Sequence, residues 1–341
     1  MRQERQPASE EILELSPTIR RLQLPIALPG LGHVNCYILE DGDGFTIVDP
    51  GLPGPPSIRA LRRGLKRAGV TTKQIRRVIV THSHPDHFGG AGYLQQACGA
   101  EVLTHEKFRL WFNPDEDSRD ELHSRVPMNM SGPTPWGGPN HQVPWHRRSA
   151  YKLMKAGWGG RWLRAPEPTR RLADSPATVI ASRELQLVHT PGHTVDHLCL
   201  FDLESEMLIS GDHVLPTITP HISGMSATQD PLADYFRSLD RVAAEVPARL
   251  VLPAHGEPFT NLAERVTEIK KHHEERLNTL RIASDTRGEA TVMELMTDLF
   301  DERSWGTMAA SETYAHLEHL RLAGELDLIE HADRPLQYRV S

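Results

Sequence analysis

Metal-binding side chains are concentrated in the segment Thr-His-Ser-His-Pro-Asp-His, which contains His82, His84, Asp86 and His87. The apolar run at residues 77–80 precedes this segment and predicts a buried strand. The first two histidines are two residues apart at the end of that strand, so they should point to the same side. The aspartate and the third histidine can reach a second point nearby. Because burial of four such groups without partners is costly, the segment predicts a site for two metal ions.

Each of three later apolar runs ends in a tight turn that carries one candidate ligand: His193, Asp212 and His255. Taken singly, each of these residues fits an ordinary turn equally well. Their succession at strand ends behind the first cluster favours a shared metal site, because His and Asp are common metal ligands.

This pattern resembles that of the metallo-β-lactamase superfamily, whose signature is HxHxDH followed by a separated His, Asp and His. The resemblance covers roughly residues 20–260 and matches all seven signature positions. It implies an α/β fold, the four-layered αββα sandwich, with metal ions at the strand ends. It also implies two ligand sets joined by one bridge, namely His82, His84 and His193 for one ion, Asp86, His87 and His255 for the second, and Asp212 between them.

The ligand types define the expected chemistry. Nitrogen and oxygen ligands without a thiolate suit zinc, and iron or manganese are alternatives. A metal-bound water loses its proton near neutral pH and can attack a carbonyl that one ion polarises. Asp86 is expected to orient this nucleophile, which makes it a candidate catalytic residue as well as a ligand.

The expected reaction is hydrolysis of an ester, thioester or lactone in a small acyl substrate. The fold alone does not select this chemistry. Two alternatives therefore stay open: a sulfur dioxygenase with mononuclear iron, and a metal-dependent ribonuclease whose tail binds nucleic acid.

Apolar periodicity predicts the elements that must position these residues. Strands are predicted at residues 34–39, 45–48, 77–80, 101–104, 185–189, 198–202, 207–210 and 250–252. Helices are predicted from residue 58 to 68, at 91–97 and at 231–244. Strands and helices together form a catalytic domain over residues 1–260.

A long insert at residues 111–170 divides this domain into two strand-rich halves. It is rich in Trp, Pro and Gly and has little periodicity. Both of its flanks are anchored near predicted ligands, so we expect a lid that shapes the substrate site. Rigid apolar rings suit such a pocket, and the candidates are Trp136, Trp145, Trp158 and Trp162. Packing of the insert against the core is the alternative role for these rings.

Residues 261–341 predict a separate module of three amphipathic helices and a hairpin, which is winged-helix-like. Residues 287–341 hold five Arg and no Lys against eleven Asp and Glu, a net charge of −6. This sign opposes contact with a phosphate backbone, so nucleic acid is not the expected partner. A packing role or a homodimer contact is expected instead.

Composition indicates a cytoplasmic globular protein. The net charge is −7, and the three cysteines lie far apart in apolar stretches, as buried reduced thiols do. The polar, acidic N-terminus does not predict a signal peptide, and no apolar run is long enough for a membrane span.

Histidine occurs 19 times, so most copies should have no metal-binding role. His189 and His213 flank the ligand motifs and are candidates to hydrogen-bond a ligand, and His33, which precedes a strand, is a candidate to face the site. His105 and His221 are expected in surface loops, and His273 in packing or at the surface.

Overall fold

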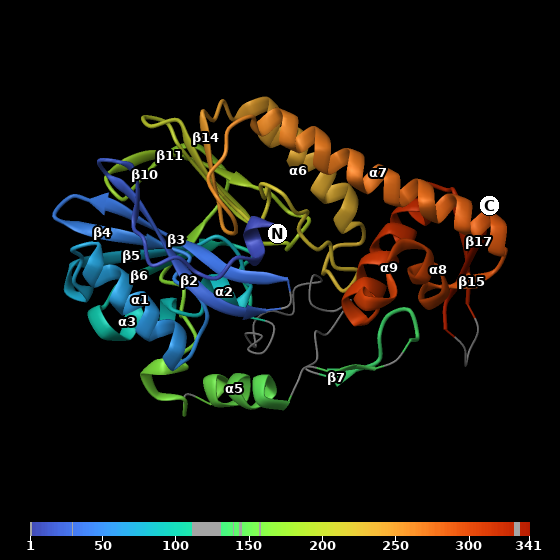
Figure 1. Cartoon of the computed structure of the whole chain (residues 1–341), viewed down its shortest axis with the longest axis horizontal. Helices are drawn as coiled ribbons and strands as arrows, with labels where there is room; N and C mark the ends of the chain where they lie inside the picture. Colours follow the sequence, from blue (N-terminus) through green and yellow to red (C-terminus); the bar gives the residue numbers. More distant parts are fainter. Residues whose placement is uncertain are drawn as a thin grey trace.

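The computed structural model describes residues 2–28, 30–110, 131–138, 140–142, 145–156, 158–330 and 335–341. Two β-sheets pack face to face, with helices on their outer faces (Figure 1). The first sheet runs in the order β1 (Leu13–Ser16), β2 (Ile19–Leu28), β3 (Leu31–Asp41), β4 (Gly44–Val48), β5 (Ile75–Val80), β6 (Glu101–His105) and β9 (Arg170–Leu172). The second runs in the order β10 (Ser175–Ile180), β11 (Arg183–His189), β12 (Leu198–Asp202), β13 (Met207–Gly211) and β14 (Leu250–Pro253).

Alternating side chains join these sheets to each other and to the helices α1 (Pro55–Arg67), α2 (Pro85–Phe88), α3 (Ala91–Cys98) and α6 (Pro231–Glu245). Val78 and Ile79 are neighbours in β5, yet Val78 belongs to the cluster that includes α1 and α3, whereas Ile79 packs between the sheets. Likewise Leu187 faces the first sheet, whereas Val188 packs beneath α6. Successive strand residues point to opposite faces, so both faces of each sheet are covered. The predicted αββα sandwich is confirmed.

The C-terminal module contains the three predicted helices, α7 (Leu262–Arg287), α8 (Val292–Leu299) and α9 (Thr307–Leu322). A small sheet accompanies them, in the order β15 (Ala290–Thr291), β17 (Gln337–Val340) and β16 (Leu326–Ile329). Leu277, Leu295 and Leu317 of the module lie in one buried cluster with Leu239 of α6 and Leu208 of the second sheet. The hydrophobic core is therefore continuous across residue 260.

The insert has more regular structure than its sequence predicts. Helix α5 (Trp145–Lys155) lies within it, and β7 (Ser131–Gly132) pairs with β8 (His141–Gln142). Residues 111–130 fall outside the described part of the chain, so the lid stays a prediction. The remaining elements are the short 3-10 helices η1 (Gln3–Arg5), η2 (Thr72–Gln74), η3 (Gly160–Trp162) and η4 (Glu302–Ser304).

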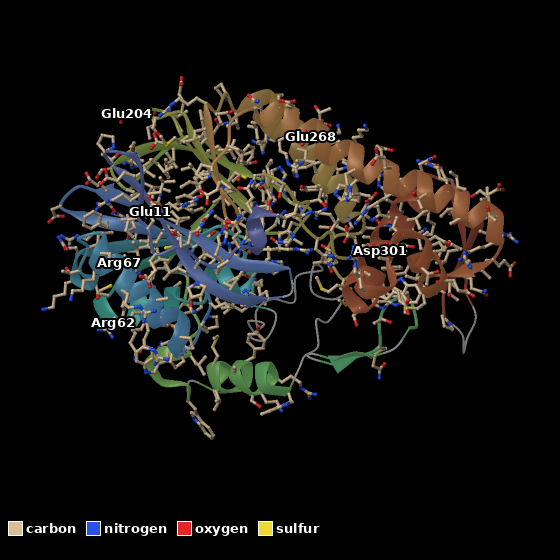
Figure 2. The ribbon with its side chains drawn as sticks, in the orientation of Figure 1. Glu11, Arg62, Arg67, Glu204, Glu268 and Asp301 are labelled. Carbon is tan, nitrogen blue, oxygen red and sulfur yellow. The ribbon has the colours of Figure 1, made fainter. Side chains whose placement is uncertain are left out.

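Charged side chains cover the outer faces of these elements. Figure 2 shows Arg67, Glu204 and Glu268 pointing away from the protein, and all three are exposed. This pattern complements the apolar inner faces that form the clusters. Among the described residues, no helix is both long enough and apolar enough to cross a membrane.

Candidate metal centre

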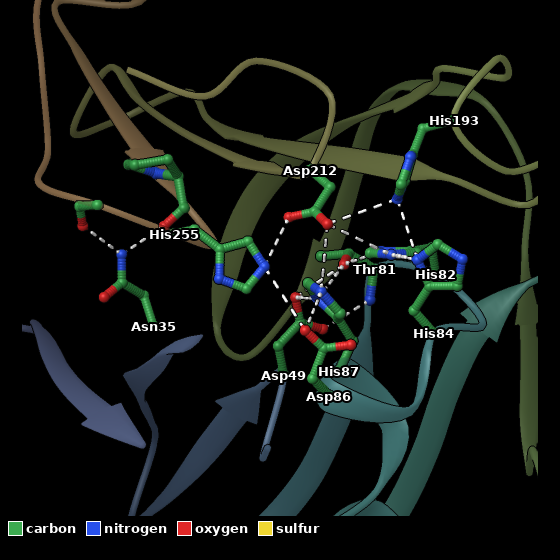
Figure 3. A network of polar contacts seen from close by, with 12 residues as sticks. Asn35, Asp49, Thr81, His82, His84, Asp86, His87, His193, Asp212 and His255 are labelled. Carbon is green, nitrogen blue, oxygen red and sulfur yellow. Dashed lines mark hydrogen bonds and ion pairs between the residues drawn. The ribbon is translucent and has the colours of Figure 1, made fainter. Parts of the chain in front are cut away.

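The predicted ligands lie where strands of both sheets end (Figure 3). His82 and His84 directly follow β5, and Pro85 then begins the short helix α2. A proline suits the first turn of a helix, where its missing N–H needs no partner. Asp86 and His87 therefore project from the first turn of α2 toward the same region.

The other three candidates come from the second sheet. His193, Asp212 and His255 lie in the turns that follow β11, β13 and β14. Together the two sheets bring the predicted ligand atoms into two buried groups, each with its atoms within 4.8 Å of one another. The first group is His82, His84, His193 and Asp212, and the second is Asp86, His87 and His255.

Asp212 lies between the two groups. Its Oδ2 is 3.5 Å from Nε2 of His193 and 3.6 Å from Nε2 of His87. Its Oδ1 is 3.3 Å from Nε2 of His255. The carboxylate thus faces ligands of both groups, which is the arrangement that a bridging role requires.

Unpartnered polar atoms show that this donor set fits cations. Nε2 of His87, Nε2 of His255 and Oδ1 of Asp212 are buried, and among the described residues they have no hydrogen-bond partner. Orphaned buried polar atoms are rare in proteins and call for an explanation such as a bound ion. Imidazole nitrogens and carboxylate oxygens that converge on one point are suitable ligands for zinc, iron or manganese.

Hydrogen bonds from the opposite ring nitrogen fix the orientation of three of the imidazoles. Nδ1 of His193 donates to the carbonyl of His221 at 2.7 Å, and Nδ1 of His255 donates to the carbonyl of His33 at 2.7 Å. Nδ1 of His87 donates in the same way to a carboxylate oxygen of Asp49. Each bond places the proton on Nδ1 and leaves Nε2 free to bind a metal. His33 thus contacts a candidate ligand through its backbone carbonyl.

His84 is oriented differently. Its Nδ1 lies 3.0 Å from Nε2 of His82 and 3.0 Å from Nε2 of His193. It therefore presents Nδ1, not Nε2, to the first group. Between His82 and His84 in the chain, the Ser83 hydroxyl donates to the buried Asp196 carboxylate at 3.0 Å.

Asp49 supports the second group and was not identified from sequence. Its Oδ2 accepts from Nδ1 of His87 at 2.8 Å and from the Thr81 hydroxyl at 2.7 Å, and its Oδ1 accepts the Thr81 N–H at 2.9 Å. Asp49 directly follows β4, whose parallel pairing with β5 brings it beside Thr81. Its φ of 53° lies in the left-handed region. Such strain often persists at functional sites, where the surrounding contacts stabilise it.

His197 is a second support residue that the sequence did not reveal. Its Nε2 accepts the backbone N–H of Asp212 at 3.0 Å, and its Nδ1 contacts the Thr190 hydroxyl at 2.7 Å. Gly211 has a φ of 51°, and a Cβ there would lie 2.5 Å from Nε2 of His197. Only glycine allows this approach, which places the Asp212 carboxylate at the centre.

The carboxylates shape the electrostatics of the site. Burial lowers the pKa of His82 and of His84 well below the usual value of 6.5. Burial also opposes protonation of His87, but the nearby Asp49, Asp212 and Asp86 raise its pKa well above the usual value. Burial would raise the pKa of Asp212, but His255 and His87 hold it well below its usual value. The centre is thus an anionic pocket that favours cations.

Three other histidine predictions need correction or refinement. His105 is buried, not in a surface loop, because its ring stacks on His189 with centroids 4.0 Å apart. His189 donates from Nε2 to the Val195 carbonyl at 2.8 Å, so it does not contact a ligand directly but stabilises the turn between β11 and β12 that carries His193. His213 is buried next to Asp212, and its carbonyl accepts the Tyr235 hydroxyl at 2.8 Å.

The four tryptophans lie in different surroundings. Trp136 is 1% exposed in the core beneath the C-terminal module, and Trp162 stacks on Tyr93 with centroids 6.0 Å apart. For Trp136 and Trp162, packing of the insert against the core therefore fits the structure better than contact with a substrate. Trp145 and Trp158 are 78% and 82% exposed, and their role in a lid stays a prediction.

Comparison with known proteins agrees with this geometry. The sequence profile described as "Metallo-beta-lactamase superfamily" matches residues 29–256. A Bacillus subtilis (strain 168) protein named "Probable metallo-hydrolase YqjP" is 26% identical over 311 residues, covering 88% of this chain and 90% of that protein. The crystal structure of a beta-lactamase domain protein from Burkholderia ambifaria is 28% identical, with a TM-score of 0.78 over 98% of this chain and 96% of that one.

A second crystal structure, of a metallo-beta-lactamase family protein from Thermus thermophilus, is 27% identical. Its TM-score is 0.73 over 96% of this chain and 100% of that one. Both structural matches extend past residue 260, so these proteins share the C-terminal region as well as the sandwich. The chain therefore belongs to the metallo-β-lactamase superfamily, which confirms the predicted metal-dependent hydrolase.

Proposed function

We propose that this enzyme uses two metal ions to hydrolyse an ester, thioester or lactone. The observation that carries the proposal is the position of Asp212, whose Oδ2 lies near His193 of the first group and His87 of the second, while its Oδ1 lies near His255. With a single ion, the three buried residues of the second group would have no partner. Burial of unpaired polar groups costs considerable free energy. Zinc is the ion that this nitrogen and oxygen set suits well, with iron or manganese as alternatives.

The metal ions would supply an ionised water as the nucleophile and would polarise the carbonyl under attack. The chain's own residues then have separate tasks. Asp86 directs Oδ2 toward the second group, 3.6 Å from Nε2 of His255 and 3.7 Å from Nε2 of His87. From there its carboxylate accepts a hydrogen bond from the attacking water and orients it. Hydrogen bonds at Nδ1 keep the rings of His87, His193 and His255 fixed, so that the site needs little rearrangement during the reaction.

Metal analysis combined with a substrate panel tests this proposal. The purified protein should contain close to two ions per chain and should hydrolyse at least one class among thioesters, esters and lactones. Removal of the ions with a chelator should abolish turnover, and added Zn²⁺ should restore it. One iron per chain with oxygen uptake would instead support the dioxygenase. Cleavage of RNA but of no acyl compound would overturn the proposed substrate class.

A further inference from the structure

The loop between Asp212 and α6 connects the metal centre to the C-terminal module. His221 lies in this loop, and its carbonyl accepts the Nδ1–H of His193 at 2.7 Å. The orientation of the His193 ring therefore depends on where this loop is held. Any contact that shifts the loop also shifts a proposed ligand of the first group.

The module holds the loop at His221 through a buried carboxylate. Glu312 of α9 is 8% exposed, and its Oε2 accepts from Nδ1 of His221 at 3.3 Å. Its Oε1 forms an ion pair with Arg276 of α7. Burial opposes ionisation, but His221 and Arg276 hold the pKa of Glu312 far below its usual value of 4.5. A charged carboxylate thus links two helices of the module to the loop.

The same loop is fixed by the module on both sides of His221. The Gly224 N–H donates to the carbonyl of Ser311 at 3.1 Å. A Cβ at Gly224 would lie 2.6 Å from that carbonyl oxygen, so the loop and α9 are in direct backbone contact. On the other side, Arg265 of α7 donates to the carbonyls of Leu215 and Ile218 at 2.7 and 2.8 Å. The loop is therefore attached to the module along most of its length.

The cluster around Glu312 offers an alternative, a third metal site. His273, Glu312 and His316 are close enough to hold an ion. However, Nδ1 of His316 donates to the Glu312 carbonyl at 2.7 Å, and its Nε2 bonds with Nδ1 of His273 at 3.0 Å. The Arg276 guanidinium would also repel a cation there. These contacts favour a structural role for the cluster, which holds Glu312 in place.

We propose that Glu312 is a positioning residue for the metal centre, which acts through His221 to orient the imidazole of His193. The C-terminal module is on this view a part of the site and not only a packing element. The inference rests on the metal-ligand role of His193 in the proposed function. According to this inference, α9 controls the affinity of the first ligand group for its metal ion. Helix α9 does so although it lies far beyond His193 in the sequence.

Glu312→Gln tests this role because it keeps the side-chain volume and removes the charge. Loss of a residue that hydrogen-bonds to a metal-bound histidine typically lowers metal affinity about 10- to 100-fold. We therefore expect one of the two ions to bind at least about 10-fold more weakly in a competition assay with a chromophoric chelator. The matched control is Asp202→Asn, which removes a buried carboxylate paired with Arg183 at the opposite end of β12 from His197. It should bind both ions as the parent does.

A second variant separates positioning from folding. His221→Ala keeps the carbonyl that His193 contacts but removes the ring that Glu312 holds. It should weaken the same ion, and the double variant should be no worse than either single one, since both act on one contact. It also replaces Glu312→Gln as the test if that variant fails to fold.

Three results would overturn the inference: parental affinity in Glu312→Gln, parental affinity in His221→Ala, or additive effects in the double variant. Failure of the proposed function looks different, because the parent protein itself would then not bind two ions.

Discussion

Replacing Asp49 with asparagine should weaken metal binding while leaving the fold intact. Asparagine has the same shape as aspartate and tolerates the left-handed backbone at this position better than most residues do. The change removes one acceptor oxygen, because an amide has one oxygen where a carboxylate has two. The carboxylate of Asp49 accepts three hydrogen bonds, two from Thr81 and one from His87.

The size of the effect follows from these contacts. In one orientation the new NH₂ group faces the Thr81 N–H, and in the other it faces Nδ1–H of His87 and the Thr81 hydroxyl. Either way at least one buried donor loses its acceptor, which costs about 1–3 kcal/mol. Loss of a partner behind a metal-bound histidine costs about 10- to 100-fold in affinity, or about 1.4–2.7 kcal/mol. The two ranges overlap, so the lost hydrogen bond is sufficient to account for the expected change in affinity.

Titration of chelator-treated protein with Zn²⁺ against a competing indicator measures the effect for each ion. We expect the ion held by His87 to bind about 10- to 100-fold more weakly and the other ion to change less. The control is Asp41→Asn at the end of β3, beside the start of β4, where a buried carboxylate accepts the Thr46 hydroxyl at 2.8 Å and pairs with Arg77. If Asp49→Asn keeps both affinities, or if Asp41→Asn lowers them equally, the support role of Asp49 is refuted.

Three further predictions use other parts of the site. Asp212→Ala should reduce the content of both ions and most of the activity, and retention of two ions with normal turnover would exclude the bridge. Burial raises the pKa of Asp196 from 3.8 to about 6, so the native state binds a proton between these values that the unfolded state lacks. Native stability in metal-free protein should therefore fall by up to about 3 kcal/mol as the pH rises through this window. Asp196→Asn should abolish that fall in urea unfolding, and identical pH profiles would contradict it. Trp162→Ala should lower stability by about 1–3 kcal/mol through loss of the stack on Tyr93, whereas the exposed Trp145→Ala should change stability by less than about 0.5 kcal/mol. If the insert is a lid, Trp145→Ala should instead change KM or substrate preference, and unchanged kinetics with every substrate would count against a role for this ring.

The candidate ligands could be picked out from the sequence because each lies in or just after the turn that follows an apolar run. Strand ends are recognisable locally, and a His or Asp at such an end is conspicuous. His82, His84 and the turn into α2 needed no knowledge of the rest of the chain. Most strands of the sandwich were predicted on the same basis, from apolar runs within short windows, whereas β1, β2, β9 and β10 were not predicted.

The residues behind the ligands could not be predicted in this way, because their contacts join distant segments. Asp49 and Thr81 are 32 positions apart and meet only through the parallel pairing of β4 with β5. Glu312 and His221 are 91 positions apart and meet through the packing of α9. The one local signal for Asp49 was an acidic residue at the end of an apolar strand. That signal is the same as the one that identified Asp212.

The regular structure within the insert could not be predicted for a related reason. Tryptophan and glycine in its sequence obscured the period of α5, and Trp136 was assigned to a substrate pocket. In the structure the Trp136 ring lies 5.5 Å from that of Tyr314 in α9, and its carbonyl accepts the N–H of Leu336. An apolar ring in an irregular segment can serve a pocket or a distant core, and only the tertiary packing decides between them.

The distribution of ligands between the sheets has a consequence for stability. The segment after β5 gives four ligands from the first sheet, and the turns after β11, β13 and β14 give three from the second. Each ligand group contains residues from both sheets, so neither sheet alone can form either group. Metal binding therefore requires the two sheets to be correctly packed, and an ion that binds only the packed state stabilises that state. The same reasoning extends to α9, because the loop that carries His221 connects the first ligand group to the C-terminal module. Sandwich and module should thus be stabilised together when the ions bind.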